Sequence, residues 1–222
     1  MRILPILFNT DMVKAIMDGC KTVTRRVVKP QPILNGGFWE LGGAGWSDTI
    51  TSLTPIPCHS LYNRMPYKPG DILYVRETWG RTFAGTADQP KYVYLASDPE
   101  WGEHEAWKWR PSIHMPKEAA RIFLRVTDVR VERLQEISLS DCVREGIPHC
   151  VIDTLCDGYC DNCDTSEAPY RRFRKLWDST VKPADLDRYG FDASPWVWVI
   201  GFERCEKPEG WPSVGGDNDG ST

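Results

Sequence analysis

The segment KTVTRR at residues 21–26 decides the fold that this sequence predicts. Valine and threonine favour β-strands, and with the apolar residues that follow they predict a strand over residues 22–28. In a regular strand, alternate side chains point to the same side, so Thr22, Thr24 and Arg26 are expected to share one face. The segment is therefore expected to be a short basic strand with one hydroxyl-bearing face.

The residues before this segment predict a strand and a short helix. Residues 3–8 are largely apolar and predict the strand. Thr10 is suited to cap a helix, and residues 12–17 place apolar side chains at helical spacing. Gly19 is expected to end the helix, because glycine readily adopts the left-handed conformation found there. Strand, helix and strand thus follow one another with almost no linker.

The residues after the segment predict a long excursion and then further strands. Residues 30–69 are rich in Pro and Gly without sustained periodicity, and so long a loop in a compact domain is usually functional or partly disordered. Strands are expected at residues 71–79 and 91–96, and most clearly at residues 121–134. In the last of these, the parity of the apolar residues switches near residues 127–128. Such a switch predicts a bulge or tight bend, as barrels need in order to curve.

The last third of the chain predicts two helices and one more strand. A helix is expected from Ser138, its N-cap, to Glu145, with Gly146 as the stop. A second helix is expected over residues 169–179 and a strand over residues 196–202. About five or six strands, a few short helices and no regular βαβ alternation predict an α+β fold with a mixed, barrel-like sheet.

Length and charge limit the classes of protein to which the chain can belong. With 222 residues it has room for one domain, expected over residues 1–206, followed by a polar, disordered tail over residues 207–222. A net charge of −4 excludes a strongly basic nucleic-acid coat, so any nucleic-acid contact is expected at a local patch. No run approaches the roughly 20 apolar residues of a membrane span, and the first residues turn polar too soon for a signal peptide. We therefore expect a cytoplasmic protein without membrane contact.

Four of the eight cysteines crowd into a short insert at residues 148–167, which favours metal ligation over disulfides in a chain without an export signal. These four residues are Cys150, Cys156, Cys160 and Cys163. Thiolates at such spacings can hold a tetrahedral, structural zinc ion, with His149 as an alternative fourth ligand. The spacing of the last three also fits an iron–sulfur cluster, but nothing else in the chain supports one, so zinc is favoured. Four free thiols are the remaining alternative.

Several short motifs, taken in their order, resemble the ASCH family, whose members have a β-barrel related to the PUA domain of RNA-modifying enzymes. The matching segments are residues 17–26, 69–79, 121–131, 141–147 and 196–203. The stretch at residues 111–116 is shared more specifically with ASCH proteins common in bacteriophage and prophage genomes. The resemblance covers most of residues 1–203, apart from the excursion and the cysteine insert. It implies a PUA-like mixed β-barrel with a few short helices.

The resemblance also implies a groove that accepts RNA or a modified nucleoside. Some ASCH proteins are amidohydrolases that remove the acyl group from N4-acetylcytidine. They use a lysine and a threonine of a Lys-Thr-x-Thr segment and a glutamate that closes a later helix. These catalytic roles fall on Lys21, Thr24 and Glu145. The glutamate position is unusual in its own right, because a carboxylate in the last turn of a helix faces the negative end of the helix dipole.

The chemistry of these residues depends on their surroundings. Lys21 can act as a base only if its pKa falls, which burial or the neighbouring Arg25 and Arg26 would promote. It precedes the regular strand and is free to swing onto the face of Thr22 and Thr24. Thr24 would then be the nucleophile or would orient a water molecule. A solvated lysine and a threonine suited to strand structure are the alternative interpretation of the same segment.

The residues expected to bind the ligand are Thr22, Arg25, Arg26, Glu77 and Trp79. Glu77 lies in an otherwise apolar strand and needs a partner if it faces inward. Arg25 or Arg26 is expected to supply that partner, either as scaffold or at the edge of the ligand. The same arginines, with Lys29 and the basic residues within 171–175, can form a phosphate-binding patch or simply a solvated face.

Three classes of function thus stay open at the level of the sequence. The first is an amidohydrolase acting on an acylated cytidine, and the second is a non-catalytic module that binds RNA in the same groove. The third is a phage interaction protein in which the barrel is a scaffold and the cysteine insert docks a partner.

Overall fold

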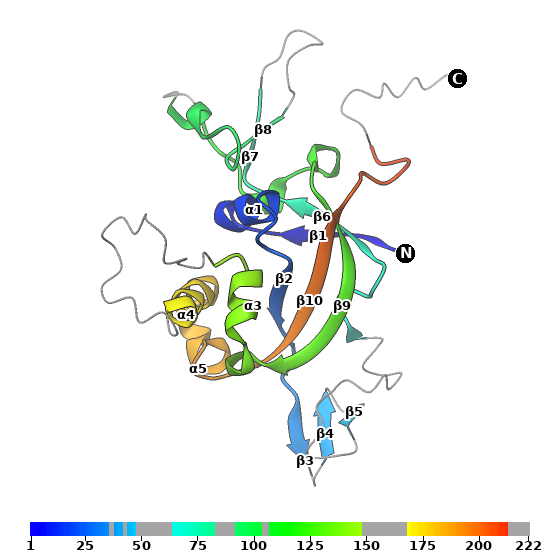
Figure 1. Cartoon of the computed structure of the whole chain (residues 1–222), viewed down its shortest axis with the longest axis vertical. Helices are drawn as coiled ribbons and strands as arrows, with labels where there is room; N and C mark the ends of the chain where they lie inside the picture. Colours follow the sequence, from blue (N-terminus) through cyan, green and yellow to red (C-terminus); the bar gives the residue numbers. More distant parts are fainter. Residues whose placement is uncertain are drawn as a thin grey trace. The chain divides into compact units, whose positions relative to one another are not determined.

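The structure, a computed structural model, describes residues 1–35, 38–41, 44–47, 64–82, 92–103, 107–147 and 168–212 (Figure 1). The chain folds into two compact units. Unit 1 is built from the described residues of 1–19, 70–126 and 203–222, and unit 2 from those of 20–69 and 127–202. The long strands β9 (Phe123–Arg133) and β10 (Trp196–Cys205) contribute residues to both units.

Both units combine strands with short helices. The helices are α1 (Thr10–Met17), α3 (Leu139–Arg144), α4 (Ala168–Thr180) and α5 (Leu186–Tyr189), with 3-10 turns at Pro99–Glu103, Ser112–His114, Lys117–Ala119, Leu134–Glu136 and Pro183–Asp185. The other strands are β1 (Ile3–Leu7), β2 (Val23–Val27), β3 (Ile33–Asn35), β4 (Phe38–Leu41), β5 (Ala44–Ser47), β6 (Ile72–Arg76), β7 (Trp79–Arg81) and β8 (Tyr92–Tyr94). The predicted α+β class is confirmed.

The main sheet is mixed, as predicted, and has the strand order β1-β6-β9-β10-β2. β1 runs parallel to β6, whereas β6 is antiparallel to β9 and β10 is antiparallel to β2. The prediction of a barrel is wrong in one respect, because this sheet is not closed into a full barrel. Within the described residues β1 and β2 are edge strands, each paired on one side only.

Unit 1 begins with a strand and a helix that are set by local signals. The N-cap of α1 is Asn9, whose side chain accepts a hydrogen bond from the Met12 amide at 2.9 Å, so the predicted cap at Thr10 is wrong by one residue. An asparagine side-chain oxygen accepts from the free amides of the first turn as well as a threonine hydroxyl does, so both Asn9 and Thr10 suit the cap position. Gly19, at a φ of +76°, follows the helix as predicted.

Unit 2 places helices against β2 and β10. Val23 of β2 and Val197 and Val199 of β10 are fully buried, and they pack with Phe173 and Trp177 of α4 in one apolar cluster. α3, α4 and α5 lie on one side of β2 in Figure 1. Cys142 of α3 belongs to the same cluster, so β2, the strand predicted from the KTVTRR segment, packs against α3 as well.

The parity switch predicted in β9 is confirmed. Leu124 and Val126 are buried on one parity and Val129 and Val131 on the other, whereas residues 127 and 128 are both exposed. Gly201 of β10 faces this position, where an added Cβ would lie 3.1 Å from the hydroxyl of Thr127. A glycine therefore permits the close approach of the two strands at the irregularity.

The Gly-rich excursion contains regular structure that was not predicted from the sequence. β3, β4 and β5 form a small antiparallel sheet. Two Gly-Gly pairs, at residues 36–37 and 42–43, separate these strands in the sequence. The strands on either side of each pair are antiparallel neighbours.

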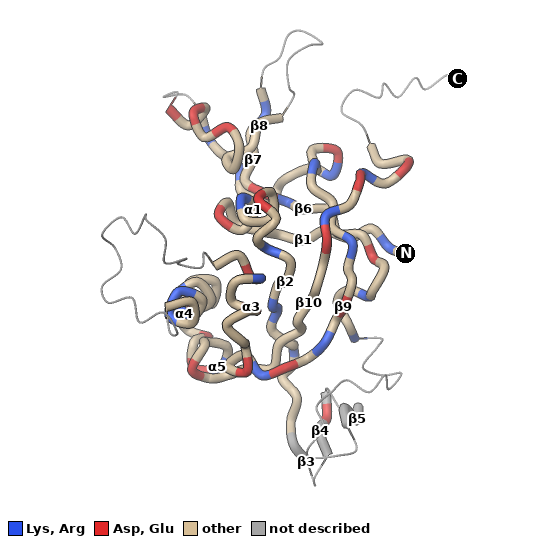
Figure 2. The backbone as a smooth tube through the Cα atoms, viewed as in Figure 1, with Lys and Arg blue, Asp and Glu red and all other residues tan. Residues whose placement is uncertain are grey.

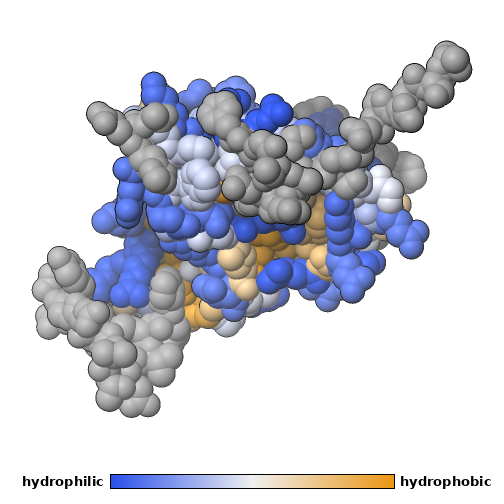
Figure 3. All heavy atoms as spheres, turned by 90° about the horizontal axis from the view of Figure 1, so that it is seen from above, coloured by the Kyte–Doolittle hydropathy of each residue, from blue (hydrophilic) through white to orange (hydrophobic). Residues whose placement is uncertain are grey.

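The predicted tail begins with residues that the structure describes. Trp211 is 6% exposed and packs in unit 1, with its ring centroid 4.9 Å from that of Tyr74 and 5.1 Å from that of Phe123. On the face seen in Figure 3, most of the described residues are hydrophilic, and hydrophobic residues are visible between them. No helix in the described ranges is long and apolar enough to cross a membrane.

Candidate functional site

The site begins where the chain leaves α1 and enters β2, next to the end of α3. Ser138 caps α3 by accepting from the Asp141 amide at 3.1 Å, and Glu145 is the C-cap residue. Gly146 follows at a φ of +89°, a conformation that glycine adopts without strain. Lys21 forms an antiparallel bridge with Glu145, so two residues 124 positions apart are brought side by side.

The ammonium group of Lys21 lies in the interior of unit 2. Its side chain is 0% exposed, and Nζ donates to the Glu145 carboxylate (Oε2, 2.6 Å). It also donates to the backbone carbonyls of Glu145 and Val23, each at 2.8 Å. Three acceptors thus surround a group with three protons, which is what a buried ammonium requires.

Arg25 is the second buried cation of the site. Its guanidinium donates to Glu145 Oε1 at 3.1 Å, to Asp141 Oδ2 at 2.7 Å and, through Nε, to Glu132 Oε1 at 3.0 Å. Lys21 and Arg25 therefore hold the two oxygens of one carboxylate between them. Neither cation has any exposed side-chain surface.

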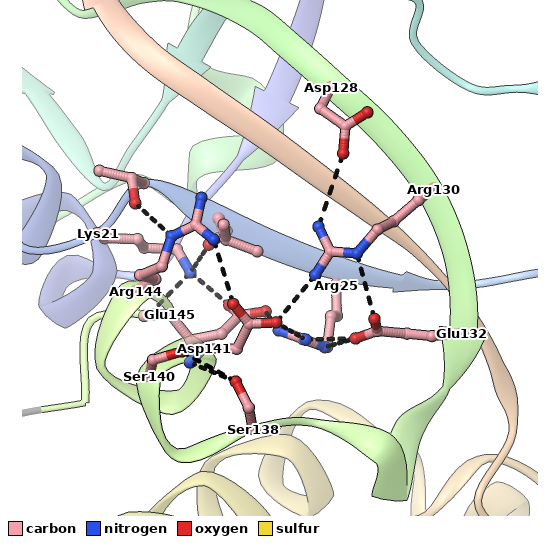
Figure 4. Close-up of polar contacts among 12 residues, drawn as sticks. Lys21, Arg25, Asp128, Arg130, Glu132, Ser138, Ser140, Asp141, Arg144 and Glu145 are labelled. Atoms are coloured by element: carbon pink, nitrogen blue, oxygen red, sulfur yellow. Dashed lines mark hydrogen bonds and ion pairs between the residues drawn. The ribbon is translucent and has the colours of Figure 1, made fainter. Parts of the chain in front are cut away.

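Two arginines at the rim of unit 2 complete the charge network, which we define as Lys21, Arg25, Arg130, Glu132, Asp141, Arg144 and Glu145. Arg130 donates to Asp141 at 2.9 Å and to Glu132 at 3.3 Å, and Arg144 donates to Asp141 at 3.2 Å. Figure 4 shows these cations converging on the carboxylates of α3 and β9, and Figure 2 marks the acidic and basic residues along β9. Four cations face three anions in this network.

The environment shifts the protonation of two members of the charge network. Burial lowers the pKa of Lys21 below its ordinary value, although the carboxylate of Glu145 opposes the shift. Burial alone would raise the pKa of Asp141, but the hydrogen bond and charge of Arg25, with Arg130 and Arg144, hold that pKa below its ordinary value. The network therefore combines an amine that loses its proton more easily with a carboxylate that stays ionised.

The predicted catalytic residues lie in one unit. Lys21 and Glu145 are in contact, and Thr24 is buried in β2 at 3% exposure. The alternation of β2 puts Thr24 on the strand face opposite Arg25. We expected Lys21 to turn to the face of Thr24. Its ammonium instead shares the carboxylate of Glu145 with Arg25, because α3 covers the face of β2 that carries Arg25.

Of the residues predicted to bind a ligand, three lie in unit 2. Arg25 is buried in the charge network, and Arg26 is half-buried on the other face of β2. Thr22 accepts a weak hydrogen bond from Arg144 at 3.4 Å, and its amide donates to the carbonyl of the same residue at 2.8 Å. Thr22 thus ties the beginning of β2 to the end of α3.

The other two predicted residues, Glu77 and Trp79, lie in unit 1. Glu77 is 1% exposed and accepts two hydrogen bonds from Arg121 at 2.9 and 3.0 Å. The predicted pairing of Glu77 with Arg25 or Arg26 is therefore wrong, because the pairing of β6 with β9 brings Arg121 to it instead. Trp79 is 4% exposed and packs edge-on against Tyr92 at 5.6 Å.

Four members of the charge network were not predicted from the sequence, namely Glu132, Asp141, Arg130 and Arg144. One signal was present, because Arg130 and Glu132 stand at alternate positions of a strand whose other face is apolar. Two opposite charges side by side on a strand predict an ionic partner nearby, yet they do not identify which one.

The predicted metal ligands lie outside the described residues. Cys150, Cys156, Cys160 and Cys163 all fall within residues 148–167, which the structure does not describe. In the ranges that it does describe, no group of three or more His, Cys, Asp or Glu side chains is arranged to hold a metal ion.

Comparison with known proteins gives one structural likeness. No family model matches the sequence, and no curated protein matches it either. The chain is similar to an ASCH domain. That domain, from Lactobacillus crispatus, shares 12% identity at a TM-score of 0.39, over 91% of this chain and 79% of that chain. A likeness of this strength supports no statement about activity.

Proposed function

We propose that this chain is an ASCH-type amidohydrolase that removes the acyl group from an N4-acylated cytidine. The observation that carries the proposal is the buried contact between Lys21 Nζ and Glu145 Oε2 at 2.6 Å. These are two of the three residues to which the motif resemblance assigns catalysis. The third, Thr24, is buried three residues along the same segment.

The reaction splits an amide with one water molecule. Either water attacks the acyl carbon directly, or the Thr24 hydroxyl attacks it and water later hydrolyses the acyl ester left on Thr24. In both cases the proton of the attacking hydroxyl passes to Glu145. The C–N bond then breaks, and the exocyclic nitrogen of cytosine leaves as an amine after receiving a proton from the Lys21–Glu145 pair. A lowered pKa makes Lys21 a better donor of that proton, since a proton carrier works best with a pKa near the working pH.

The test is hydrolysis of N4-acetylcytidine, followed by chromatography of the cytidine produced. We expect turnover by the wild-type protein and a loss of roughly 100-fold or more in the Glu145→Gln and Lys21→Met variants. Circular dichroism of each variant establishes that it is folded. No turnover by the folded wild-type protein, or full turnover by both folded variants, contradicts the proposal.

The complete hydrogen bonding of Lys21 also fits a structural ion pair, so a second candidate function is non-catalytic RNA binding. All three protons of its ammonium are donated within the protein, as in a purely structural ion pair. Filter binding to short RNAs over a salt series tests this function, because contacts with phosphates weaken as salt rises. Salt-dependent RNA binding without hydrolysis would favour it over the amidohydrolase.

We further propose that the cysteine insert holds one structural zinc ion. Its support is the spacing of Cys150, Cys156, Cys160 and Cys163 in the sequence. Metal analysis of the purified protein tests it, with about one zinc per chain expected and a ratio near zero as the contrary result.

A further inference from the structure

A cavity of about 430 Å³ lies in unit 2 beside the end of β2. Arg26 and Lys29 line it from β2 and the residues that follow. Trp177, Lys182 and Tyr189 line it from α4, α5 and the segment between these helices. Its size falls within the roughly 300–1,000 Å³ of small-molecule sites. The hydrolytic chemistry proposed above does not use these residues.

The cavity carries an excess of positive charge. Its charged lining residues are Arg25, Arg26, Lys29, Lys182 and Asp185. On a chain with a net charge of −4, four cations against one anion make this a local basic site. Because Arg25 is bound to three carboxylates, the exposed Lys29 and Lys182 supply the charge closest to solvent. Such a concave basic surface attracts anions.

The end of α4 does not offset this charge. The C-terminal carbonyls of a helix normally disfavour an anion nearby. Here the hydroxyl of Thr180 donates to the carbonyl of Trp177 at 2.7 Å, and the hydroxyl of Ser179 donates to that of Leu176 at 2.6 Å. Two carbonyls of the last turn are thus already satisfied by side chains.

Two aromatic residues of the cavity are held in place. The indole N–H of Trp177 donates to the carbonyl of Tyr189 at 2.8 Å, which joins α4 to α5. The ammonium of Lys29 lies 4.7 Å from the centre of the Tyr189 ring. Fixed aromatic rings next to cations suit a nucleotide, because the rings contact a base and the cations contact its phosphate.

We infer that this cavity binds a nucleotide through its phosphate, with Lys29 and Lys182 as the phosphate contacts and Tyr189 beside the base. The basic residues within 171–175, for which a phosphate-binding patch and a solvated face were both left open, do not line the cavity, whereas Lys182 does. The inference goes beyond the proposed function, because none of Lys21, Thr24 and Glu145 lines the cavity. It rests on that function for the identity of the base alone.

The test is isothermal titration of the full chain with cytidine 5′-monophosphate and with cytidine, at low salt. We expect the wild-type protein to bind the monophosphate about tenfold more tightly than the nucleoside. The Lys29→Gln/Lys182→Gln variant is expected to lose this preference. The Lys14→Gln/Lys207→Gln variant, which removes two exposed lysines outside the cavity, is a control of equal charge and is expected to keep it.

Equal affinity of the wild-type protein for the two ligands, or no binding of either, overturns the inference. It is also overturned if the Lys29→Gln/Lys182→Gln variant keeps the preference. Phosphate preference without hydrolysis of N4-acetylcytidine contradicts the amidohydrolase and leaves the cavity assignment standing. Hydrolysis without phosphate preference contradicts the cavity assignment and leaves the amidohydrolase standing, so the two failures are distinguishable.

Discussion

Each unit buries a glutamate, and the two glutamates are neutralised in different ways. In unit 2, Glu145 is 4% exposed and receives hydrogen bonds from Lys21 and Arg25, both without exposed side-chain surface. In unit 1, Glu77 is 1% exposed and pairs with Arg121, whose side chain is 29% exposed. One carboxylate belongs to a buried network, and the other to a pair at the boundary with solvent.

The pKa values of Glu77 and Asp141 show how a single partner and a network affect the ionisation of a carboxyl group. Burial raises the pKa of Glu77 above its ordinary value, although Arg121 opposes the shift. In the charge network, by contrast, the several cations hold the pKa of Asp141 below its ordinary value. A single partner thus leaves Glu77 easier to protonate, whereas several cations keep Asp141 ionised.

The largest expected effect comes from removing the centre of the charge network. Arg25→Met leaves Glu132 and Asp141 with fewer cations and Glu145 with Lys21 alone. We expect the free energy of unfolding to fall by about 3–5 kcal/mol, as when one partner of a buried ion pair is lost. Urea denaturation measures it. Arg171→Gln, on the exposed face of α4, is the matched control and is expected to change the value by less than about 0.5 kcal/mol.

A smaller effect is expected from Asp141→Asn, and it depends on pH. Because the folded-state pKa of Asp141 is below its ordinary value of 3.8, its ionised form stabilises the protein above that pH, and this contribution is lost as the pH falls below it. Removing its charge-assisted hydrogen bonds is expected to cost about 1–3 kcal/mol at neutral pH. Urea denaturation at about pH 7 and about pH 3 should show the difference between variant and wild type shrinking in acid. A difference that grows in acid would contradict the assignment.

Breaking the Glu77–Arg121 pair of unit 1 should also destabilise the protein less at acidic pH than at neutral pH, and the effect should be smaller than that of Asp141→Asn. Arg121→Gln leaves Glu77 buried without its cation, for an expected loss of about 1–2 kcal/mol at neutral pH, because Arg121 is partly hydrated. Burial holds the pKa of Glu77 above its ordinary 4.5, so this carboxyl is protonated more easily in the folded state than in the unfolded state. Its protonation removes the need for a partner, and the loss should vanish as the pH falls to about 4. Thermal unfolding over that pH range measures it, and a loss that is constant with pH would argue against a buried Glu77.

The smallest effect is expected at the rim of the charge network. Arg144 is 50% exposed and bonds to Asp141 at 3.2 Å, so solvent screens most of the interaction. Arg144→Gln is expected to change the free energy of unfolding by less than about 1 kcal/mol. A loss as large as that of Arg25→Met would mean that exposed and buried members of the network contribute equally to stability, which contradicts this account.

Local signals in the sequence predicted much of the fold. The cap at Ser138, the glycine after each of α1 and α3, and the parity switch in β9 are set by residues within a few positions, and all three are confirmed. The cap of α1 was wrong by one residue because Asn9 and Thr10 both suit the position. The closure of the sheet was not predictable, since it depends on whether two distant edge strands meet.

The charge network was harder to predict, because it depends on pairing between distant segments. Lys21 and Glu145 were named together only through the family motifs, and no local pattern joins residues that far apart. The partner of Glu77 was missed for the same reason: Arg121 reaches it through the β6–β9 ladder. Sequence spacing reports which side chains share a face, but the sheet order decides which faces meet.

The most direct test compares the rates of hydrolysis after substitution of each of the two buried glutamates. Turnover of N4-acetylcytidine is measured for wild type, Glu145→Gln and Glu77→Gln, with Lys14→Gln as an exposed control. The proposed role of the Lys21–Glu145 contact predicts a loss of roughly 100-fold or more for Glu145→Gln, with the other two variants near wild type once corrected for the folded fraction. Equal rates for folded Glu145→Gln and wild type would contradict it.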